Sequence, residues 1–291
     1  MRIWLMAARP RTLPAAVAPV LVGTALAGFD HRFRPLAFVA ALLGAVFIQA
    51  GTNLSNDYSD ARRGADTEDR LGPVRVTAGG LVPPRQVLIA TYVSFGVAVL
   101  MGLYLVTVAG WALLLVGGAS ILAGVLYTGG PRPYGYEGLG EVFVFLFFGI
   151  VAVTGSYFVQ VERLPWEAFA LAVPVGLLAA AILVVNNVRD LETDRRAGKR
   201  TLAVRLGSGS ARRLYAAMVF GAFASTPVPW VFGSLSAWLL LAFIAFPPAV
   251  PLVRTVAQRS DGPSLNAALA RTGMLQLAFC VLLSAGILLS R

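Results

Sequence analysis

The feature that most constrains the fold is the stretch of residues 86 to 127, which contains no charged side chain. As one helix rising 1.5 Å per residue, this stretch would be about 63 Å long, twice the roughly 30 Å of hydrocarbon in a bilayer. A tight turn near Gly110 must therefore divide it. We predict one membrane-spanning helix on each side of this glycine.

The whole chain has the composition of a membrane protein. Of its 291 residues, 57% are hydrophobic and 13% are charged, and the mean hydropathy is +0.75. The sequence therefore predicts an all-α integral membrane bundle of about nine spans, in one domain of residues 1–291. The apolar runs that predict these spans cover residues 12–29, 35–57, 86–108, 110–128, 139–160, 166–188, 210–230, 234–254 and 265–290. Pro247, Pro248 and Pro251 predict a kink or a shortening in the eighth span.

Basic residues are divided unequally between the two sides of this predicted bundle. The amino terminus and the loops on its side hold 20 of the 24 lysines and arginines. By the positive-inside rule, we expect these loops in the cytoplasm and the protein in the cell inner membrane. The net charge of +10 lies between apolar runs, so lipid rather than nucleic acid is the expected partner. The single cysteine, Cys280, excludes an intrachain disulfide and a cysteine-based metal site.

Acidic residues gather at two places, the cytoplasmic ends of the second and sixth spans. Eight of the fourteen are found there: Asp57, Asp60, Asp66, Glu68, Asp69, Asp190, Glu192 and Asp194. Because the two spans are four apart in the chain, they run in the same direction and their polar ends can meet at one depth.

Each of these span ends carries an amide and two carboxylates on one helical face. Asn53, Asp57 and Asp60 stand at i, i+4 and i+7. Asn186, Asp190 and Asp194 stand at i, i+4 and i+8. Carboxylates held this close repel one another unless a cation lies between them. Oxygen ligands without histidine or cysteine favour Mg²⁺, and the nearby arginines and Lys199 favour a polyanion such as a diphosphate.

Several alternatives stay open at this point. The arginines Arg62, Arg63, Arg195, Arg212 and Arg213 could be solvated charges that only follow the positive-inside rule. The aspartates are harder to explain in this way, because ionisable groups at membrane depth are costly and usually functional. The phenylalanines Phe143, Phe145, Phe147 and Phe148 could pack or could contact substrate, and Glu137 and Glu141 are unassigned. We expect His31 to be a surface residue.

Two segments resemble the aspartate-rich motifs of the UbiA superfamily of membrane prenyltransferases. NDYSDARRGAD resembles the first motif, and NNVRDLETDRRAGKRTLAVRLG resembles the second. ARPRTLPAAVAPVLVG, RVTAGGL and YTGGPRPYGYEGLGEVFVFLFFG add to the resemblance and favour the branch that acts on 1,4-dihydroxy-2-naphthoate. The similarity runs from residue 8 to about residue 207. Asp66 departs from the usual spacing of the third carboxylate, so we leave it outside the metal set.

The resemblance implies a helical bundle around a central cavity, with a lateral opening to lipid and the two motifs on the cytoplasmic side. It implies that Asn53, Asp57 and Asp60, with Asp190 and Asp194, hold Mg²⁺ and diphosphate, and that the four aspartates are catalytic. It further implies that the substrates contact a second set of residues, namely Tyr127, Arg132, Asn186, Asn187, Lys199 and Arg200.

The implied reaction is transfer of a polyprenyl group from an allylic diphosphate to 1,4-dihydroxy-2-naphthoate. It would release diphosphate and carbon dioxide and give a demethylmenaquinol. Another acceptor, such as 4-hydroxybenzoate or homogentisate, is the main alternative. A cation transporter is a remote one, because these aspartates lie at span ends beside basic loops rather than at mid-membrane.

Overall fold

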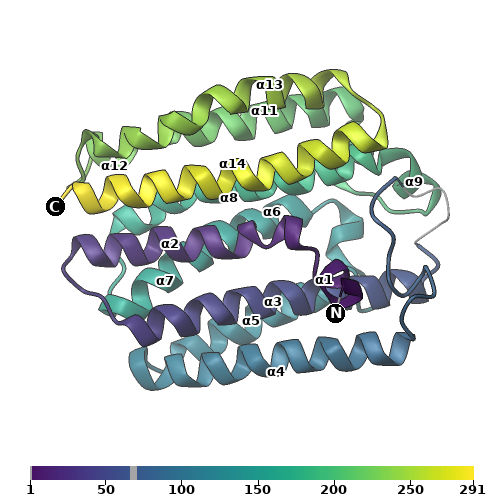
Figure 1. Ribbon diagram of the computed structural model, residues 1–291, viewed down its shortest axis with the longest axis horizontal. Coiled ribbons are helices and arrows are strands. Elements are labelled where there is room, and N and C mark those ends of the chain that lie inside the picture. Colours follow the sequence, from purple (N-terminus) through teal and green to yellow (C-terminus); the bar gives the residue numbers. More distant parts are fainter. Residues whose placement is uncertain (1, 66–70) are drawn as a thin grey trace.

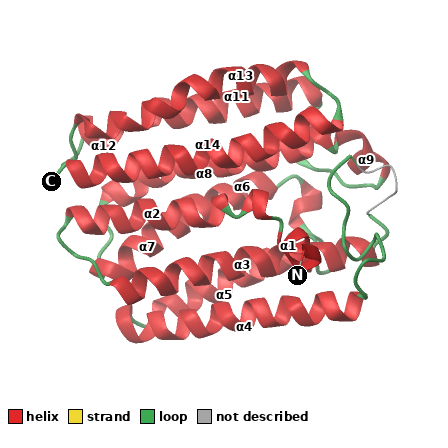
Figure 2. Cartoon of the chain, in the orientation of Figure 1, coloured by secondary structure: helices red, strands yellow, loops and turns green. Residues whose placement is uncertain are grey.

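The computed structural model describes residues 2–65 and 71–291 of the chain, and in this part every regular element is a helix (Figure 2). Within these residues, seven helices are long and apolar enough to cross a membrane, and an eighth span results if the bent pair Ile3–Thr12 and Pro14–Phe29 counts as one. The all-α multi-pass membrane fold is therefore confirmed. The predicted number of nine remains approximate, because the helix Ala112–Leu126 is shorter than the others.

The long helices lie roughly parallel to one another in layers (Figure 1). The elements in chain order are α1 (Arg2–Ala8), η1 (Pro10–Thr12), α2 (Pro14–Phe29), α3 (Pro35–Arg62), α4 (Pro84–Ala109), α5 (Ala112–Leu126), η2 (Tyr134–Glu137), α6 (Gly140–Val144), η3 (Phe145–Val151), α7 (Ala152–Val161), α8 (Trp166–Arg189), α9 (Leu191–Arg196), α10 (Leu202–Leu206), α11 (Ser208–Ser225), α12 (Val228–Val231), η4 (Ala237–Ala245), α13 (Phe246–Gln258) and α14 (Gly262–Leu289).

The long uncharged stretch turns where the sequence predicts. α4 ends at Ala109 and α5 begins at Ala112, with Gly110 between them at φ 94°. This backbone conformation is open to glycine and strained for residues with a Cβ atom. The turn therefore depends on the residue type at this position.

The core of the bundle is built around α8. This helix is buried along most of its length and packs against α11, α14, α6 and η3. Many of its buried residues are small, among them Ala168, Ala172, Gly176 and Ala180. Small side chains let neighbouring helix backbones approach closely within a membrane.

One span contains a π-helical segment that the sequence did not predict. The run from Gly140 to Val161 forms α6, the π-helix η3 and α7 without a break. Within η3, a Cβ atom on Gly149 would lie 2.6 Å from the Cα atom of Gly176 on α8. The close contact of these two glycines holds η3 against the core helix, and π-helical turns are frequent at functional sites.

The eighth span changes helix type at its prolines. The 3₁₀ helix η4 ends at Ala245, and α13 begins at Phe246 with prolines in its first turn. A proline in the first turn of an α-helix loses no intrahelical hydrogen bond. Pro247 and Pro248 thus mark a change of helix type, and Pro251 lies inside α13. The predicted shortening does not occur, because Ala237–Gln258 is one span of 22 residues.

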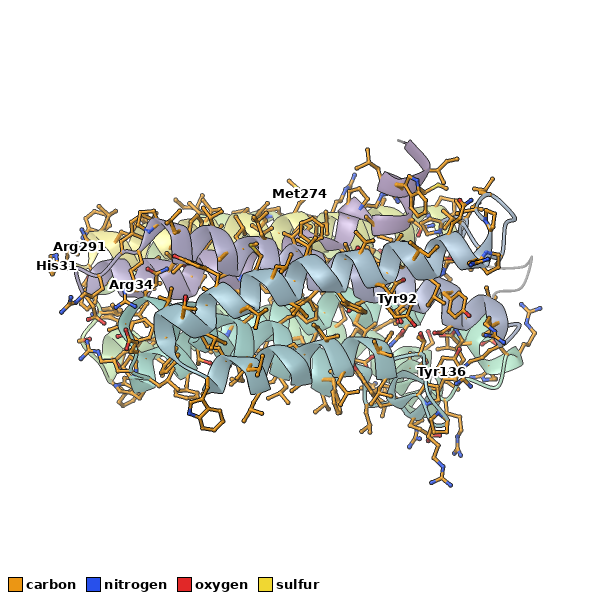
Figure 3. The ribbon with its side chains drawn as sticks, turned by 90° about the horizontal axis from the view of Figure 1, so that it is seen from below. His31, Arg34, Tyr92, Tyr136, Met274 and Arg291 are labelled. Atoms are coloured by element: carbon orange, nitrogen blue, oxygen red, sulfur yellow. The ribbon has the colours of Figure 1, made fainter. Side chains whose placement is uncertain are left out.

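The outer surface carries the apolar side chains expected of a bilayer-facing protein. Exposed large side chains cover α4, α5 and α14, including Ile89, Val93, Leu100, Leu115, Met274 and Val281. His31, Arg34 and Arg291 lie at one end of the molecule and Tyr136 lies at the other (Figure 3). His31 is exposed in a turn, in agreement with the prediction.

Candidate active site

A cavity of about 570 Å³ lies between the helices, and we call it the central cavity. The cytoplasmic ends predicted for the second and sixth spans, at the end of α3 and at α9, lie at the same end of the bundle (Figure 1). The polar residues that line the cavity include Asn53, Asn56, Asp60, Asn186, Asn187, Asp190, Asp194 and Lys199. Much of the remaining lining is apolar. Two sequence motifs that are far apart in the chain therefore share one cavity.

Asn53 connects α3 to the amino-terminal segment. Its amide Nδ2 donates to the carbonyl oxygen of Ala8 at 2.9 Å and to the Thr12 hydroxyl at 3.2 Å. Gln49, one turn earlier on α3, also donates to the Thr12 hydroxyl at 3.2 Å. These bonds hold the segment between α1 and α2 against the first motif.

Asp57 binds a backbone loop. Its carboxylate accepts hydrogen bonds from the backbone N–H of Val76 at 3.1 Å and of Thr77 at 2.9 Å. The side chain is buried and does not line the central cavity. In this arrangement Asp57 fixes the RVTAGGL segment beside the first motif.

Asp60 is the centre of a charged cluster. Its carboxylate accepts from the Tyr136 hydroxyl at 2.7 Å and from Arg75 at 3.2 Å, and lies 3.5 Å from Lys199 Nζ. Lys199 Nζ is also 3.9 Å from Asp194 and 4.9 Å from the centre of the Tyr136 ring. Lys199 is the only lysine in the sequence. It joins the first motif to the second by charge.

Asp190 is paired with its neighbour in sequence. Arg189 donates to both carboxylate oxygens of Asp190, at 2.8 and 2.5 Å, and to Asn186 at 2.8 Å. The same guanidinium donates to Asn266 on α14 at 2.7 Å. Asn266 in turn donates to the Leu71 carbonyl oxygen at 2.8 Å. The second motif is thus tied to the last span and to the loop after α3.

The sequence predicts one continuous helix through the second motif, and the structure interrupts it. Asp190 has φ −93° and ψ 8°, and separates α8 from α9. The interruption is small, because Asp190 N–H donates to the Asn186 carbonyl oxygen at 3.1 Å and Asp194 N–H donates to that of Asp190 at 2.7 Å. The stripe from Asn186 to Asp194 still faces the central cavity.

A second group of residues that line the cavity consists of amide and aromatic side chains. Asn56 accepts from the Thr128 hydroxyl at 2.9 Å, and Asn187 donates to Glu141 at 2.8 Å. The rings of Tyr127 and Tyr134 meet edge-on at 5.5 Å. Burial raises the pKa of the Tyr134 phenol, so it stays neutral.

Aromatic rings continue this group into the cavity. Tyr134 stacks on Phe143 at 4.0 Å, and Phe143 stacks on Phe147 at 6.2 Å. Phe143, Phe147 and Phe148 line the cavity, whereas Phe145 does not. The π-helical segment therefore directs some of the phenylalanines inward and leaves Phe145 on the side of Gly176.

Most of the predicted site residues line the central cavity, and a few do not. Those that line the central cavity are Asn53, Asp60, Tyr127, Asn186, Asn187, Asp190, Asp194 and Lys199. Arg132 and Arg200 are exposed and do not line it. The backbone N–H of Arg200 donates to the Tyr136 carbonyl oxygen at 2.9 Å. Asp66, with Glu68 and Asp69, lies outside the described residues.

Sequence reasoning missed several residues that contact the motifs directly, among them Arg75, Tyr136, Arg189 and Asn266. Arg75 and Tyr136 stand in the RVTAGGL and YTGGPRPYGYEGLGEV segments, so membership of these segments was a usable signal. Arg189 is adjacent to Asp190 and could have been paired with it. Asn266 gives no local signal, because only the fold brings α14 to the second motif.

The donor set suits a hard divalent cation. The carboxylates and amides that face the cavity offer oxygen ligands, which Mg²⁺ prefers. Among the described residues there is no group of three acidic, histidine or cysteine side chains close enough to hold an ion alone. Mg²⁺ usually keeps waters and binds one or two carboxylates together with substrate phosphates. The site therefore fits an ion that arrives with a diphosphate.

Residues 16–288 match the UbiA prenyltransferase family, so this chain belongs to that family of membrane enzymes. It is 40% identical to the 1,4-dihydroxy-2-naphthoate octaprenyltransferase of Mycobacterium leprae (strain TN), over 99% of this chain and 96% of the relative. It is also 40% identical to the enzyme of that name from Escherichia coli (strain K12), with the same coverage.

The fold agrees with solved structures of the family. A UbiA homolog from Archaeoglobus fulgidus bound to GPP and Mg²⁺ superimposes with a TM-score of 0.69. The two sequences are 15% identical, and the match covers 98% of this chain and 99% of the other. The predicted UbiA-type fold is thereby confirmed.

Proposed function

We propose that the protein transfers a polyprenyl group from an allylic polyprenyl diphosphate to 1,4-dihydroxy-2-naphthoate. The observation that carries this proposal is the meeting of Asp60 and Asp194 at Lys199, beside a largely apolar cavity. Charged groups at the mouth suit a diphosphate, and the apolar lining suits its hydrocarbon tail. The names of the relatives from Mycobacterium leprae and Escherichia coli support the choice of acceptor.

Divalent metal is part of this proposal. Asp60, Asp190 and Asp194, with Asn53 and Asn186, would hold Mg²⁺ together with the diphosphate; Asp57 would act through the loop that it binds. Bound Mg²⁺ supplies electrostatic stabilisation of the leaving diphosphate. The Mg²⁺ named for the Archaeoglobus fulgidus homolog supports the choice of ion.

The basic residues of the cavity would bind the leaving group. Among the described residues, those that line it are Arg9, Arg75 and Lys199. Arg75 and Lys199 already hold the Asp60 carboxylate. As the C–O bond of the allylic diphosphate breaks, its electron pair goes to the diphosphate oxygen, where these cations stabilise the new charge. The remaining allylic cation lies among the rings and aliphatic side chains that exclude water.

The aromatic acceptor then reacts with the allylic cation. A ring carbon of the dihydroxynaphthoate attacks the allylic cation and forms the new C–C bond. The carboxylate on that carbon leaves as carbon dioxide, and the electrons of the broken bond return to the ring. This restores aromaticity and gives a demethylmenaquinol.

A long prenyl tail needs more room than the cavity provides, and the lining offers an exit to lipid. Val99, Leu114 and Val116 line the cavity and are also exposed on the outer surface of α4 and α5. We propose that the tail leaves the bundle there. We further propose that the protein lies in the cell inner membrane, with its amino terminus and the site loops in the cytoplasm, on the strength of the basic-residue imbalance.

The test is product identification by mass spectrometry with the purified protein in detergent or vesicles. Octaprenyl diphosphate and Mg²⁺ are supplied with 1,4-dihydroxy-2-naphthoate, 4-hydroxybenzoate or homogentisate. We expect prenylated product and carbon dioxide with the first acceptor, and loss of turnover in Asp60→Asn and Asp190→Asn. The exposed Glu137→Gln variant is the matched control. Product only with another acceptor would refute the choice of substrate, and metal uptake into vesicles without any product would favour the transporter.

A further inference from the structure

A buried carboxylate near the cavity is left with half of its hydrogen-bonding capacity unused. Glu141 is 3% exposed, and its Oε1 accepts from Asn187 Nδ2 at 2.8 Å. Its Oε2 is buried and has no hydrogen-bond partner among the described residues. Burying such an oxygen costs free energy, so the position of Glu141 needs an explanation beyond packing.

The explanation lies in what Glu141 does to Asn187. A side-chain amide has one donating end, the NH₂ group, and one accepting end, the oxygen. The NH₂ group of Asn187 donates to Glu141 Oε1. This leaves the amide oxygen, Oδ1, without a partner in the described part of the chain, on a residue that lines the central cavity.

The hydrogen-bonding chemistry of this oxygen distinguishes it from a contact to the diphosphate. Asn187 comes one helical turn before Asp190 on α8, which places it about 4.5 Å deeper along the helix. The charged cluster around Asp60 and Lys199 belongs to the mouth. Leu183, which precedes Asn187 by one turn on α8, and Tyr127 also line the cavity. The Oδ1 atom needs a hydrogen-bond donor, which a ring hydroxyl offers and an ionised diphosphate does not.

The packing around Glu141 keeps the pair in place. A Cβ atom on Gly140 would lie 3.0 Å from Leu183 Cδ2 and 3.2 Å from the Tyr127 ring. A larger residue at position 140 would require both side chains to shift by a few tenths of an ångström. Glu141 thus stands on a tightly packed turn that faces α8.

We propose that Asn187 Oδ1, oriented by Glu141, accepts a hydrogen bond from a hydroxyl group of the aromatic acceptor. Asn187 is then a substrate-recognition residue, and Glu141 is a positioning residue that acts through it. The proposal rests on the proposed function and names residues that read its acceptor. It predicts selectivity for aromatic acceptors that donate from a ring hydroxyl.

The test asks whether the ring hydroxyl of the acceptor and the Asn187 amide contribute to binding through one shared hydrogen bond. Asn187→Leu keeps the side-chain size and removes the accepting oxygen. Glu141→Gln also keeps the size, but its amide can pair with Asn187 in either orientation, so the orientation of Asn187 is no longer fixed. Glu137→Gln, whose carboxylate is exposed and bound to Arg205 at 2.9 Å, is the matched control. Equilibrium binding and KM are measured for the dihydroxynaphthoate and for its two mono-methyl ethers, which each lack one ring hydroxyl.

We expect Asn187→Leu to weaken acceptor binding about tenfold, the loss of one hydrogen bond, and Glu141→Gln to weaken it by a smaller factor. One of the methyl ethers should bind wild-type protein about tenfold more weakly and lose nothing further in Asn187→Leu. In both variants, KM for the prenyl diphosphate and the thermal stabilisation by Mg²⁺ with inorganic diphosphate should stay within twofold of wild type. The control Glu137→Gln should equal wild type in all of these measurements.

Two results would overturn the inference. If the variants weaken the binding of Mg²⁺ and diphosphate instead, Asn187 belongs to the leaving-group site. If Asn187→Leu still discriminates against both ethers as wild-type protein does, the amide does not read a hydroxyl. Should Asn187→Leu fail to fold, Glu141→Gln decides alone by the same measurements. Failure of the proposed function is seen separately, as absence of prenyl transfer by wild-type protein.

Discussion

Replacement of Lys199 by methionine tests the charged cluster at the cavity mouth. Methionine keeps an unbranched side chain and removes the cation that lies 3.5 Å from Asp60 and 3.9 Å from Asp194. All three side chains are largely buried, with exposed fractions of 10%, 2% and 14%. The two carboxylates would then lose the counter-ion that they share.

The size of the effect follows from these distances. At an effective dielectric constant of about 20, each contact is worth about 4 to 5 kcal/mol before desolvation is subtracted. Removing one partner from a buried ion pair costs about 3 to 5 kcal/mol. Arg75 and Tyr136 still hold Asp60 in the variant, so we expect a loss of about 3 kcal/mol, or about 6 to 12 °C in melting temperature.

The measurement is thermal unfolding of the purified protein in detergent, with and without Mg²⁺. With Lys199 removed, a divalent cation can take its place between Asp60 and Asp194. Mg²⁺ alone should therefore raise the melting temperature of Lys199→Met more than that of wild-type protein. Lys199→Arg, which keeps the charge, is the control. Equal melting temperatures and equal responses to Mg²⁺ in Lys199→Met and wild type would refute this reasoning.

Three further predictions concern the packing, the first motif and the metal. Gly149→Ala should destabilise the protein by about 1 to 3 kcal/mol in thermal unfolding, because its Cβ atom would collide with Gly176, whereas Gly96→Ala on α4 meets open space and should stabilise by about 0.5 to 1 kcal/mol. Asp57→Asn should cost about 1 to 3 kcal/mol, because the amide offers only one accepting atom to two backbone N–H groups; an unchanged melting temperature would contradict this. Removal of divalent metal by a chelator should abolish prenyl transfer, and added Mg²⁺ should restore it.

Much of the fold could be predicted because hydropathy determines it. The turn at Gly110 follows from the length of the uncharged stretch, and the junction at Pro247 follows from the chemistry of proline. The π-helical segment Phe145–Val151 could not be predicted in this way. It depends on the approach of Gly149 to Gly176, a contact between two helices that is absent from either segment alone.

The candidate site shows the same division. Periodicity placed Asp60 and Asp194 on faces that meet, and the structure brings both to Lys199. Periodicity could not indicate that Asp57 turns to a backbone loop, because the loop partner has no side-chain pattern. Nor could it indicate that Asn266, in the last span, holds Arg189, since that pair is 77 residues apart.

The single lysine of this chain allows the site to be labelled selectively. Amine-selective reagents do not modify arginine, so within the side chains of this protein they can react only at Lys199. Its ammonium group lies beside Asp60 and Asp194, and the side chain as a whole is 10% exposed. The extent of modification at this one atom therefore reports how open the cavity mouth is. A fluorophore, a cross-linker or a mass tag attached there would mark the site without any engineered residue.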